Sequence, residues 1–257
     1  MRRLIEKMSR KVILKRKLPK RYGSTPIYVS PDAGLRFWST NSEKWDLKLF
    51  NICDEFVKPD SVVWDVGANV GLFTFPAAIR AKNGKVLAIE PDIFLMNLLQ
   101  KTISIGKNKN CDWAQIDLLP LAISDQIGAL KFNISERNRS TNFISGVNSL
   151  PCDSGGIRES KTVMGVTLDW LLDYYPAPSI LKIDVERAEE QVLKGTSTML
   201  GKIRPIIIIE CGVKPEYKKA IGEIFNRYNY KIYSAEANPN QRKELSQPTF
   251  NNIALPQ

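Results

Sequence analysis

Hydrophobic residues along the chain fall into short unbroken runs separated by segments with helical spacing. Runs typical of strands occupy residues 61–66, 85–90, 112–117, 180–185 and 206–210. The first, fourth and fifth are almost entirely apolar, as expected for strands buried on both faces of a sheet. Apolar residues at i, i+3 and i+4 spacing predict helices over residues 72–81, 93–105, 187–200 and 216–228.

This alternation of strands and helices predicts the fold class. It favours parallel pairing and an α/β fold with a doubly wound, mostly parallel sheet that has helices on both faces. Ligands of such sheets bind beyond the carboxyl ends of the strands. Residues 124–166 are rich in Ser, Asn and Gly and interrupt the rhythm. We expect hairpins or long loops there, in a position to contact a substrate.

Charge divides the chain into two unequal parts. The net charge is +10, yet residues 1–21 hold ten Lys and Arg side chains and a single acid, Glu6. The remainder carries 27 basic and 26 acidic residues, so it has no overall basic field. We therefore predict a basic N-terminal arm over residues 1–23 and one domain over residues 24–257.

The arm also carries apolar side chains at nearly helical spacing. They are Leu4, Ile5, Met8, Val12, Ile13 and Leu14. One interpretation is a basic amphipathic helix that lies on an anionic membrane surface, and the other is a solvated or partner-packing arm. Nucleic-acid binding is less favoured, because no aromatic residue precedes Tyr22 to stack on bases.

Composition excludes several kinds of chemistry. The chain has no histidine, which removes imidazole bases and His-ligated metal sites. The four cysteines are Cys53, Cys111, Cys152 and Cys211, and none shares a C-x-x-C spacing. We expect reduced thiols and a cytoplasmic protein, since there is neither a membrane-spanning apolar run nor a secretory signal peptide.

A glycine turn is the most informative segment. Residues 62–66 form an apolar strand that ends in Gly67 and Gly71, followed by a helical pattern. A dinucleotide site would show G-x-G-x-x-G, whereas the spacing here is G-x-x-x-G. Asp65 beside the turn would repel a pyrophosphate but suits the positively charged S-adenosylmethionine. The glycine spacing and Asp65 thus disfavour a nicotinamide-dependent oxidoreductase, whereas Glu90, 23 residues after Gly67, is expected to accept hydrogen bonds from a ribose and fits either cofactor.

Taken in order, these motifs resemble the FkbM-like family of S-adenosylmethionine-dependent methyltransferases. The matching blocks are residues 65–71, 88–92, 121–125, 166–169, 181–186, 188–189, 192–195, 204–205, Glu210 and 252–256. The resemblance implies a class I methyltransferase, Rossmann-like fold. It also implies methyl transfer from S-adenosylmethionine to a hydroxyl of a sugar, a glycan or another small acceptor.

The resemblance also implies the cofactor-binding residues. The methionine part would be bound by Asp65, Gly67, Ala68, Asn69 and Gly71. The ribose region would be bound by Glu90, Pro91 and Asp92, and the adenine region by Ala122, Ser124 and Asp125. One position departs from the family, which usually has glycine where this chain has Arg187. Either the backbone there does not need a positive φ, or the site has gained a cation near the substrate.

Lys182, Asp184 and Glu186 are the catalytic candidates. Strand alternation puts them on one side of a central strand, where three charges are costly unless they are paired or face a cleft. Without histidine, the base that takes the acceptor proton is Asp184 first and Lys182 second. Lys182 would otherwise hold the acceptor oxygen or lower the pKa of Asp184. The alternative is a structural Lys–Asp pair, with Glu186 near the positive N-terminus of the next helix.

Metal dependence and other functions remain as alternatives. Asp184, Glu186 and Glu210 could bind Mg²⁺, but we do not favour this because the carboxylates lack a fixed ligand spacing. The preferred function is O-methylation of a sugar, glycan or other small hydroxylated acceptor. The alternatives are an RNA methyltransferase guided by the basic arm, or a non-catalytic nucleoside-binding or membrane-surface adaptor.

Overall fold

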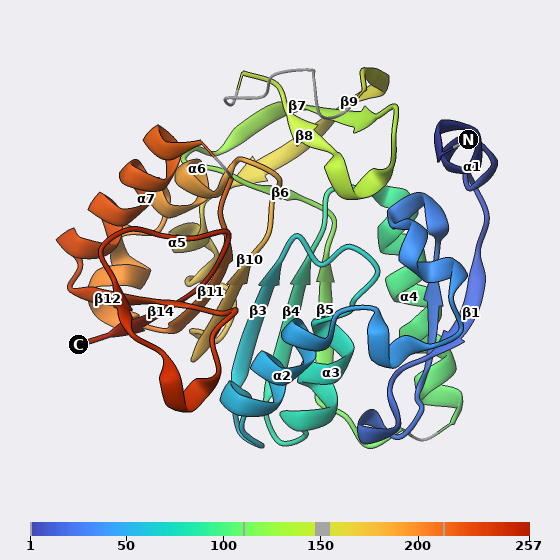
Figure 1. Ribbon diagram of the computed structural model, residues 1–257, viewed down its shortest axis with the longest axis horizontal. Helices are drawn as coiled ribbons and strands as arrows, with labels where there is room; N and C mark the ends of the chain where they lie inside the picture. The colour runs from blue at the N-terminus through green and yellow to red at the C-terminus, as the bar shows by residue number, and fades with distance from the viewer. Residues whose placement is uncertain (1, 110, 147–154, 213) are drawn as a thin grey trace.

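The computed structural model describes residues 2–109, 111–146, 155–212 and 214–257. Its centre is a sheet with the strand order β13-β12-β14-β11-β10-β3-β4-β5 (Figure 1). The strands are β3 (Val62–Val66), β4 (Lys85–Ile89), β5 (Gln115–Leu119), β10 (Ile180–Ile183), β11 (Ile206–Glu210), β12 (Tyr230–Ser234), β13 (Glu244–Leu245) and β14 (Asn251–Pro256). Strands β5, β4, β3, β10 and β11 pair in parallel, and β14 is antiparallel to β11.

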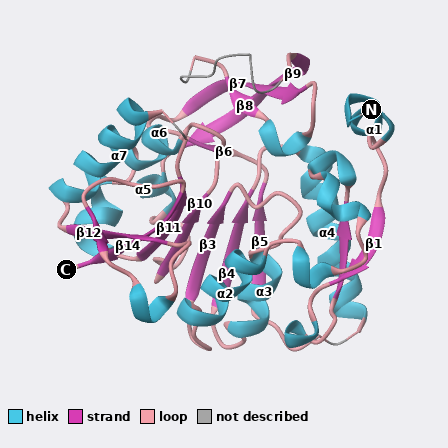
Figure 2. Ribbon diagram, in the orientation of Figure 1, coloured by secondary structure: helices cyan, strands magenta, loops and turns pink. Residues whose placement is uncertain are grey.

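Helices cover both faces of this sheet (Figure 2). They are α2 (Leu47–Phe56), α3 (Thr74–Arg80), α4 (Ile93–Asn108), α5 (Leu168–Leu171), α6 (Glu189–Lys194) and α7 (Pro215–Arg227). Successive side chains of a strand point to opposite faces. Trp64 and Val66 of β3 therefore share a buried cluster with residues of α5, α6 and α7, while Val63 packs with residues of α2 and α3. The predicted doubly wound α/β sheet is confirmed.

Several predicted boundaries are wrong in detail. Strand β10 ends at Ile183, so Glu186 lies beyond the strand and outside its alternation. The helix predicted over residues 187–200 is two pieces, α6 and the π-helical η6 (Met199–Ile203). Gly195 stands between them, where a Cβ would lie 2.4 Å from the carbonyl oxygen of Ser124. This close approach, rather than helical propensity, decides the local path of the chain.

Strands within residues 122–146 and 155–166 form a second sheet above the carboxyl ends of the central strands (Figure 1). It has the order β6-β9-β7-β8, and we call it the cap sheet. Its strands are β6 (Ala122–Ile123), β7 (Gly128–Ser135), β8 (Phe143–Ile144) and β9 (Ile157–Val166). Strand β7 pairs antiparallel with both β8 and β9, which confirms the expected hairpin structure.

The N-terminal segment is only partly helical. Helix α1 (Arg2–Met8) ends well before Leu14, so the helix predicted through Leu14 is wrong in length. Strand β1 (Leu14–Lys17) instead pairs antiparallel with β2 (Pro26–Val29). Leu18 and Tyr22 are buried. The pairing of β1 with β2 and the burial of Leu18 and Tyr22 thus join residues on both sides of residue 23, where we predicted that the arm ends.

A buried ion-pair network joins the N-terminal segment to the cap sheet. Asp32 accepts hydrogen bonds from Arg139 at 3.0 Å and from both terminal nitrogens of Arg158 at 2.8 Å. Arg139 also bonds Asp92, which caps the N-terminus of α4 and accepts from Asn142 at 2.9 Å. Because both aspartates are buried, the network holds three parts of the chain in a fixed relation.

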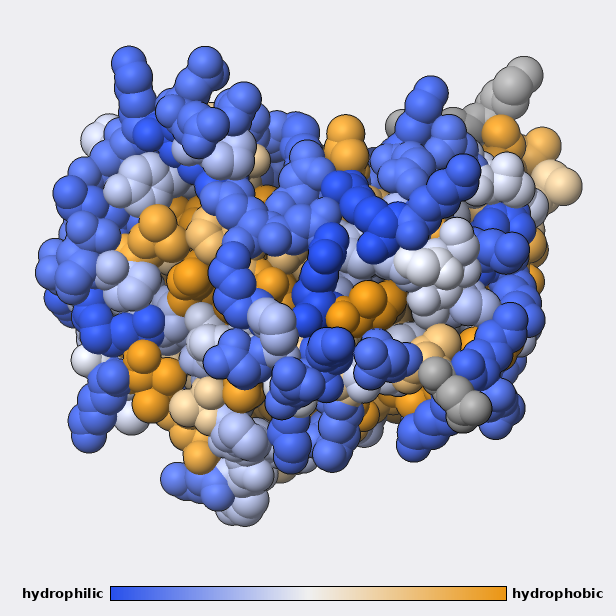
Figure 3. Space-filling view, turned by 90° about the horizontal axis from the view of Figure 1, so that it is seen from below, coloured by the Kyte–Doolittle hydropathy of each residue, from blue (hydrophilic) through white to orange (hydrophobic). Residues whose placement is uncertain are grey.

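The surface of the described residues is mostly hydrophilic (Figure 3). Among the described residues, no helix is both long and apolar enough to cross a membrane. Seen from below, hydrophilic side chains dominate and apolar residues appear between them in separate groups (Figure 3). Cys53, Cys111 and Cys211 are free thiols, and Cys152 lies outside the described residues.

We expect Asp32→Ala to destabilise the protein by about 3–5 kcal/mol, because it leaves buried guanidinium groups without their counter-charge. Denaturant unfolding followed by circular dichroism measures the change. The control is Glu159→Ala, which removes the exposed partner of Lys161 and is expected to cost less than about 1 kcal/mol. Equal effects of the two substitutions would contradict the structural role of the network.

Candidate active site

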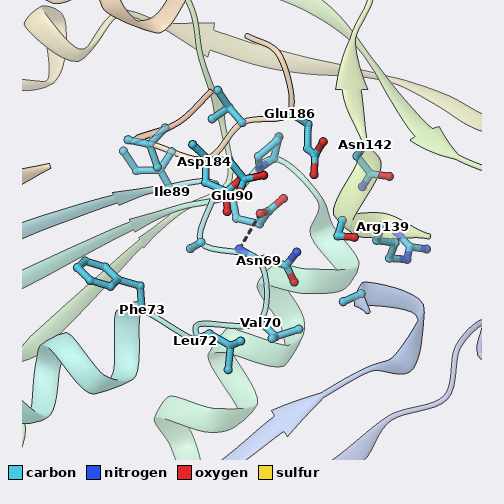
Figure 4. Close-up of a pocket in the computed structure, with 18 of the residues that line it drawn as sticks. Asn69, Val70, Leu72, Phe73, Ile89, Glu90, Arg139, Asn142, Asp184 and Glu186 are labelled. Carbon is cyan, nitrogen blue, oxygen red and sulfur yellow. Dashed lines mark hydrogen bonds between the residues drawn. The ribbon is translucent and has the colours of Figure 1, made fainter. Parts of the chain in front are cut away.

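A cavity of about 460 Å³ lies between the carboxyl ends of the central strands and the cap sheet (Figure 4). This volume is within the range of small-molecule and cofactor sites. Its lining comes from the glycine turn, the ends of β4, β10 and β11, the residues before α2, and the cap sheet. The cavity is thus at the position expected for the ligand site of a doubly wound sheet.

The glycine turn forms one wall of the cavity. Gly67 and Gly71 have φ of +78° and +88°, and Asn69 between them has φ of +52°. A Cβ on Gly67 would lie 1.9 Å from the carbonyl oxygen of Asp184. Glycine is therefore required at position 67 both by the backbone angle and by the close approach of the neighbouring loop.

Glu90 connects the glycine turn to the next strand. Its carboxylate accepts hydrogen bonds from the backbone N–H groups of Asn69 and Asp92, each at 2.9 Å. Figure 4 shows the bond to Asn69 at the floor of the cavity. Burial raises the pKa of Glu90 to about 7, although the two N–H donors act in the opposite direction. Glu90 also lines the cavity, so its carboxylate can accept further hydrogen bonds from a ligand bound there.

Lys182 is a buried cation beneath the turn. Its Nζ donates to the carbonyl oxygen of Gly67 at 2.9 Å and forms ion pairs with Asp65 at 3.1 Å and Asp184 at 3.5 Å. Burial acts to lower the pKa of Lys182, but Asp65 and Asp184 outweigh it and the pKa is raised. The raised pKa favours the charged form of Lys182, in which the ammonium holds the turn and Asp184 and has no lone pair to accept a proton.

Three carboxyl groups gather at the far end of the cavity. Asp184, Glu186 and Glu210 all line it, and the Asp184 side chain is 37% exposed. Burial and the neighbouring Asp184 raise the pKa of Glu186, and raise that of Glu210 to about 8. Among the described residues, no group of three or more such side chains is arranged to hold a metal ion.

The loop after β10 has an unusual backbone. Glu186 and Arg187 are consecutive non-glycine residues with φ of +50° and +76°. The backbone N–H of Arg187 donates to the carboxylate of Glu189 at 3.1 Å, and Glu189 in turn accepts from the hydroxyl of Tyr217. The expectation that position 187 might not need a positive φ is therefore wrong, and arginine occupies a conformation that favours glycine.

The structure brings most of the predicted site residues to the cavity. Those that line it are Gly67, Ala68, Asn69, Glu90, Pro91, Ala122, Lys182, Asp184 and Glu186. Asp65 is fully buried behind the turn, where it binds Lys182 and accepts from Thr74 at 2.6 Å. Gly71, Asp92, Ser124 and Asp125 are not among the lining residues.

Sequence reasoning missed the contribution of the cap sheet and of the segment before α2. Arg139 and Asn142 reach the cavity from the cap sheet, and Arg36, Asp46 and Phe73 line its other side. Figure 4 shows Arg139 and Asn142 beside the glycine turn. The one signal for the cap residues was the irregular stretch at residues 124–166, which marked a region but no particular side chain.

The residues that line the cavity fit a nucleoside cofactor that carries an amino acid. The Oδ1 atom of Asn69 is buried at the cavity wall without a hydrogen-bond partner, which leaves an acceptor for an ammonium group. Glu90 can accept hydrogen bonds from ribose hydroxyls, while Asp184 supplies negative charge for a sulfonium. This donor and acceptor set matches S-adenosylmethionine.

Comparison with known proteins decides the assignment. The profile of the "Methyltransferase FkbM domain" family matches residues 65–232, which is more than half of the chain. The chain belongs to the FkbM methyltransferase family. It is therefore an S-adenosylmethionine-dependent methyltransferase of the class I fold.

Two curated relatives and one solved structure can be compared with the chain directly. The methyltransferase is 27% identical over 184 residues to the hexuronic acid methyltransferase AglP of Haloferax volcanii, covering 70% of this chain and 68% of the relative. It is 23% identical to the AMB antimetabolite synthetase AmbE of Pseudomonas aeruginosa, covering 68% of this chain but 10% of that protein. The solved methyltransferase FkbM from Methylobacillus flagellatus has a TM-score of 0.52 at 16% identity, and the aligned part covers 77% of this chain and 44% of that one.

We expect Arg187→Gly to be more stable than Arg187→Ala by about 1–2 kcal/mol, because alanine keeps the cost of a left-handed backbone and glycine does not. Both substitutions remove the same side chain beyond Cβ, so any interaction of the guanidinium cancels in the comparison. Denaturant unfolding of the two variants measures the difference. A glycine variant no more stable than the alanine variant would show that the loop stores no strain at this position.

Proposed function

We propose that this methyltransferase transfers a methyl group from S-adenosylmethionine to an oxygen of a sugar, with a uronic acid or a glycan that contains one as the preferred acceptor. The observation that carries the proposal is Asp184, a half-exposed carboxylate that lines the acceptor end of the cavity and is oriented by Lys182. The similarity to a hexuronic acid methyltransferase supports the choice of acceptor. The RNA-methyltransferase and adaptor alternatives are not favoured.

The proposed roles follow from the positions of the side chains. Bound S-adenosylmethionine supplies a methyl group on a positively charged sulfur. Asn69 would hold the ammonium group and Glu90 the ribose of the cofactor, and Lys182 keeps Gly67 and Asp184 in place. Asp184 would accept the proton of the acceptor hydroxyl, whose oxygen would take the methyl group while S-adenosylhomocysteine leaves with the electron pair of the former carbon–sulfur bond. Positioning and this proton transfer together account for the acceleration.

The cavity lining bears on which oxygen reacts. Asp184 lines the cavity beside Glu186 and Glu210, and its negative charge would repel a sugar carboxylate placed next to the sulfonium. Arg36 also lines the cavity, where it pairs with Asp46 at 3.2 Å. We propose that a uronic acid places its carboxylate towards Arg36 and a hydroxyl towards Asp184. Mg²⁺ is not needed for this arrangement.

We also propose that the enzyme works in the cytoplasm and is held at a membrane by the basic residues 1–21. The free thiols of Cys53, Cys111 and Cys211 support a reducing compartment. The concentration of positive charge in this segment supports an anionic surface as its partner.

The test is methylation of free glucuronic acid and free glucose with S-adenosylmethionine, followed by mass spectrometry and by treatment with alkali. We expect an alkali-stable methyl ether, formed faster on glucuronic acid. Asp184→Asn should lower kcat by about 10²–10⁴-fold, the usual contribution of a positioned base. The affinity for S-adenosylhomocysteine should stay within about threefold.

Asp173→Asn, at an exposed aspartate outside the cavity, is the matched control and should keep full activity. An alkali-labile methyl ester formed equally well by Asp184→Asn would contradict the role of Asp184, because a carboxylate nucleophile needs no base. Methylation of neither sugar would contradict the acceptor assignment.

A further inference from the structure

Helix α1 exposes its apolar side chains and buries polar ones. Leu4, Ile5 and Met8 are 63%, 40% and 69% exposed, whereas Glu6 and Ser9 are buried. This is the reverse of an ordinary surface helix, whose apolar face packs on the core. The apolar face of α1 therefore lacks a partner within the described part of the chain.

Contacts with two other segments hold α1 in place. Arg10 forms an ion pair with Glu136 of the cap region at 2.6 Å, and Arg137 lies 3.6 Å from Glu6. The hydroxyl of Ser9 accepts a hydrogen bond from the indole N–H of Trp38 at 3.2 Å. The exposed face is thus a fixed feature of the fold and not the side of a loose tail.

An aromatic residue and lysines surround the apolar centre. Trp38 is 44% exposed and has an apolar ring with a polar N–H, the combination that is enriched where membranes meet water. Lys7 and Lys11 are exposed close by in the chain. We call Leu4, Ile5, Met8, Trp38, Lys7 and Lys11 the N-terminal patch.

The N-terminal patch stands beside the active-site cavity. Trp38 ends the 3-10 helix η3 (Leu35–Trp38), and Leu35 and Arg36 of this helix line the cavity. On the other side, Glu136 is two residues from Asn138, which also lines it. Figure 1 shows α1 next to both the cap sheet and the N-terminal helical turns.

We propose that the N-terminal patch docks on an anionic lipid bilayer and brings the cavity rim at residues 35–36 against the membrane surface. Leu4, Ile5 and Met8 enter the interfacial region, and the lysines contact lipid head groups. An RNA partner fits less well, because aliphatic side chains occupy the centre of the patch. This inference rests on the proposed function: the enzyme then methylates sugars that are presented at the membrane surface.

The test is co-sedimentation of the full chain with vesicles of phosphatidylcholine, with and without about 30% phosphatidylserine. We expect binding to the anionic vesicles that weakens with salt, and weak binding to neutral ones. Leu4→Gln/Met8→Gln should weaken binding at least about tenfold. The matched control, Leu47→Gln/Met164→Gln, changes the same residue types at sites that are each 53% exposed, and should bind as the wild type does.

Equal binding by the two double variants, or no binding to anionic vesicles, would overturn the proposal. So would binding of single-stranded RNA, or self-association that is lost in Leu4→Gln/Met8→Gln, in place of vesicle binding. S-adenosylhomocysteine affinity and turnover of free glucuronic acid are measured in the same samples and should not change in either variant. If the protein binds anionic vesicles but does not methylate free glucuronic acid, the acceptor assignment is contradicted and the membrane-binding role of the N-terminal patch stays supported.

Discussion

The buried ammonium of Lys182 is the contact on which the active site depends. It lies between β3 and β10, where it meets the carbonyl oxygen of Gly67 and the carboxylates of Asp65 and Asp184. A buried charge is tolerated only when it is paired and hydrogen-bonded. The same contact therefore fixes the shape of the cofactor turn and the orientation of the proposed base. Asp65, which the sequence suggested as a direct cofactor ligand, acts from behind the turn.

The charge of the cavity follows from this arrangement. Lys182 neutralises part of the negative charge of Asp65 and Asp184, while Glu186 and Glu210 have raised pKa values because of burial and of Asp184. The carboxylate of Asp184 lines the far end of the cavity, and its negative charge suits a cofactor with a positively charged sulfur. That charge also lowers the attraction for an anionic acceptor, which is why we propose that the carboxylate of a uronic acid lies towards Arg36, one of the cations that line the cavity.

Local patterns in the sequence predicted the central sheet and the cofactor side of the site. The apolar strand before Gly67 and the acid that ends the next strand are signals within a few residues, so the turn and Glu90 were found. Arg139, Asn142 and Arg36 were missed because they reach the cavity through tertiary contacts between distant segments. Arg187 was recognised as unusual, but its φ of +76° depends on the hydrogen bond to Glu189, which the sequence does not reveal.

Calorimetric titration of Lys182→Met with S-adenosylhomocysteine, next to the wild type, tests the central claim most directly. Thermal unfolding recorded in parallel establishes that the variant is folded at the temperature of the titration, and the uncharged Lys182→Gln serves if it is not. We predict a dissociation constant at least about tenfold higher, because the Gly67 carbonyl and Asp65 lose the charged donor that shapes the turn. Wild-type affinity in a folded Lys182 variant that lacks the positive charge would contradict the account.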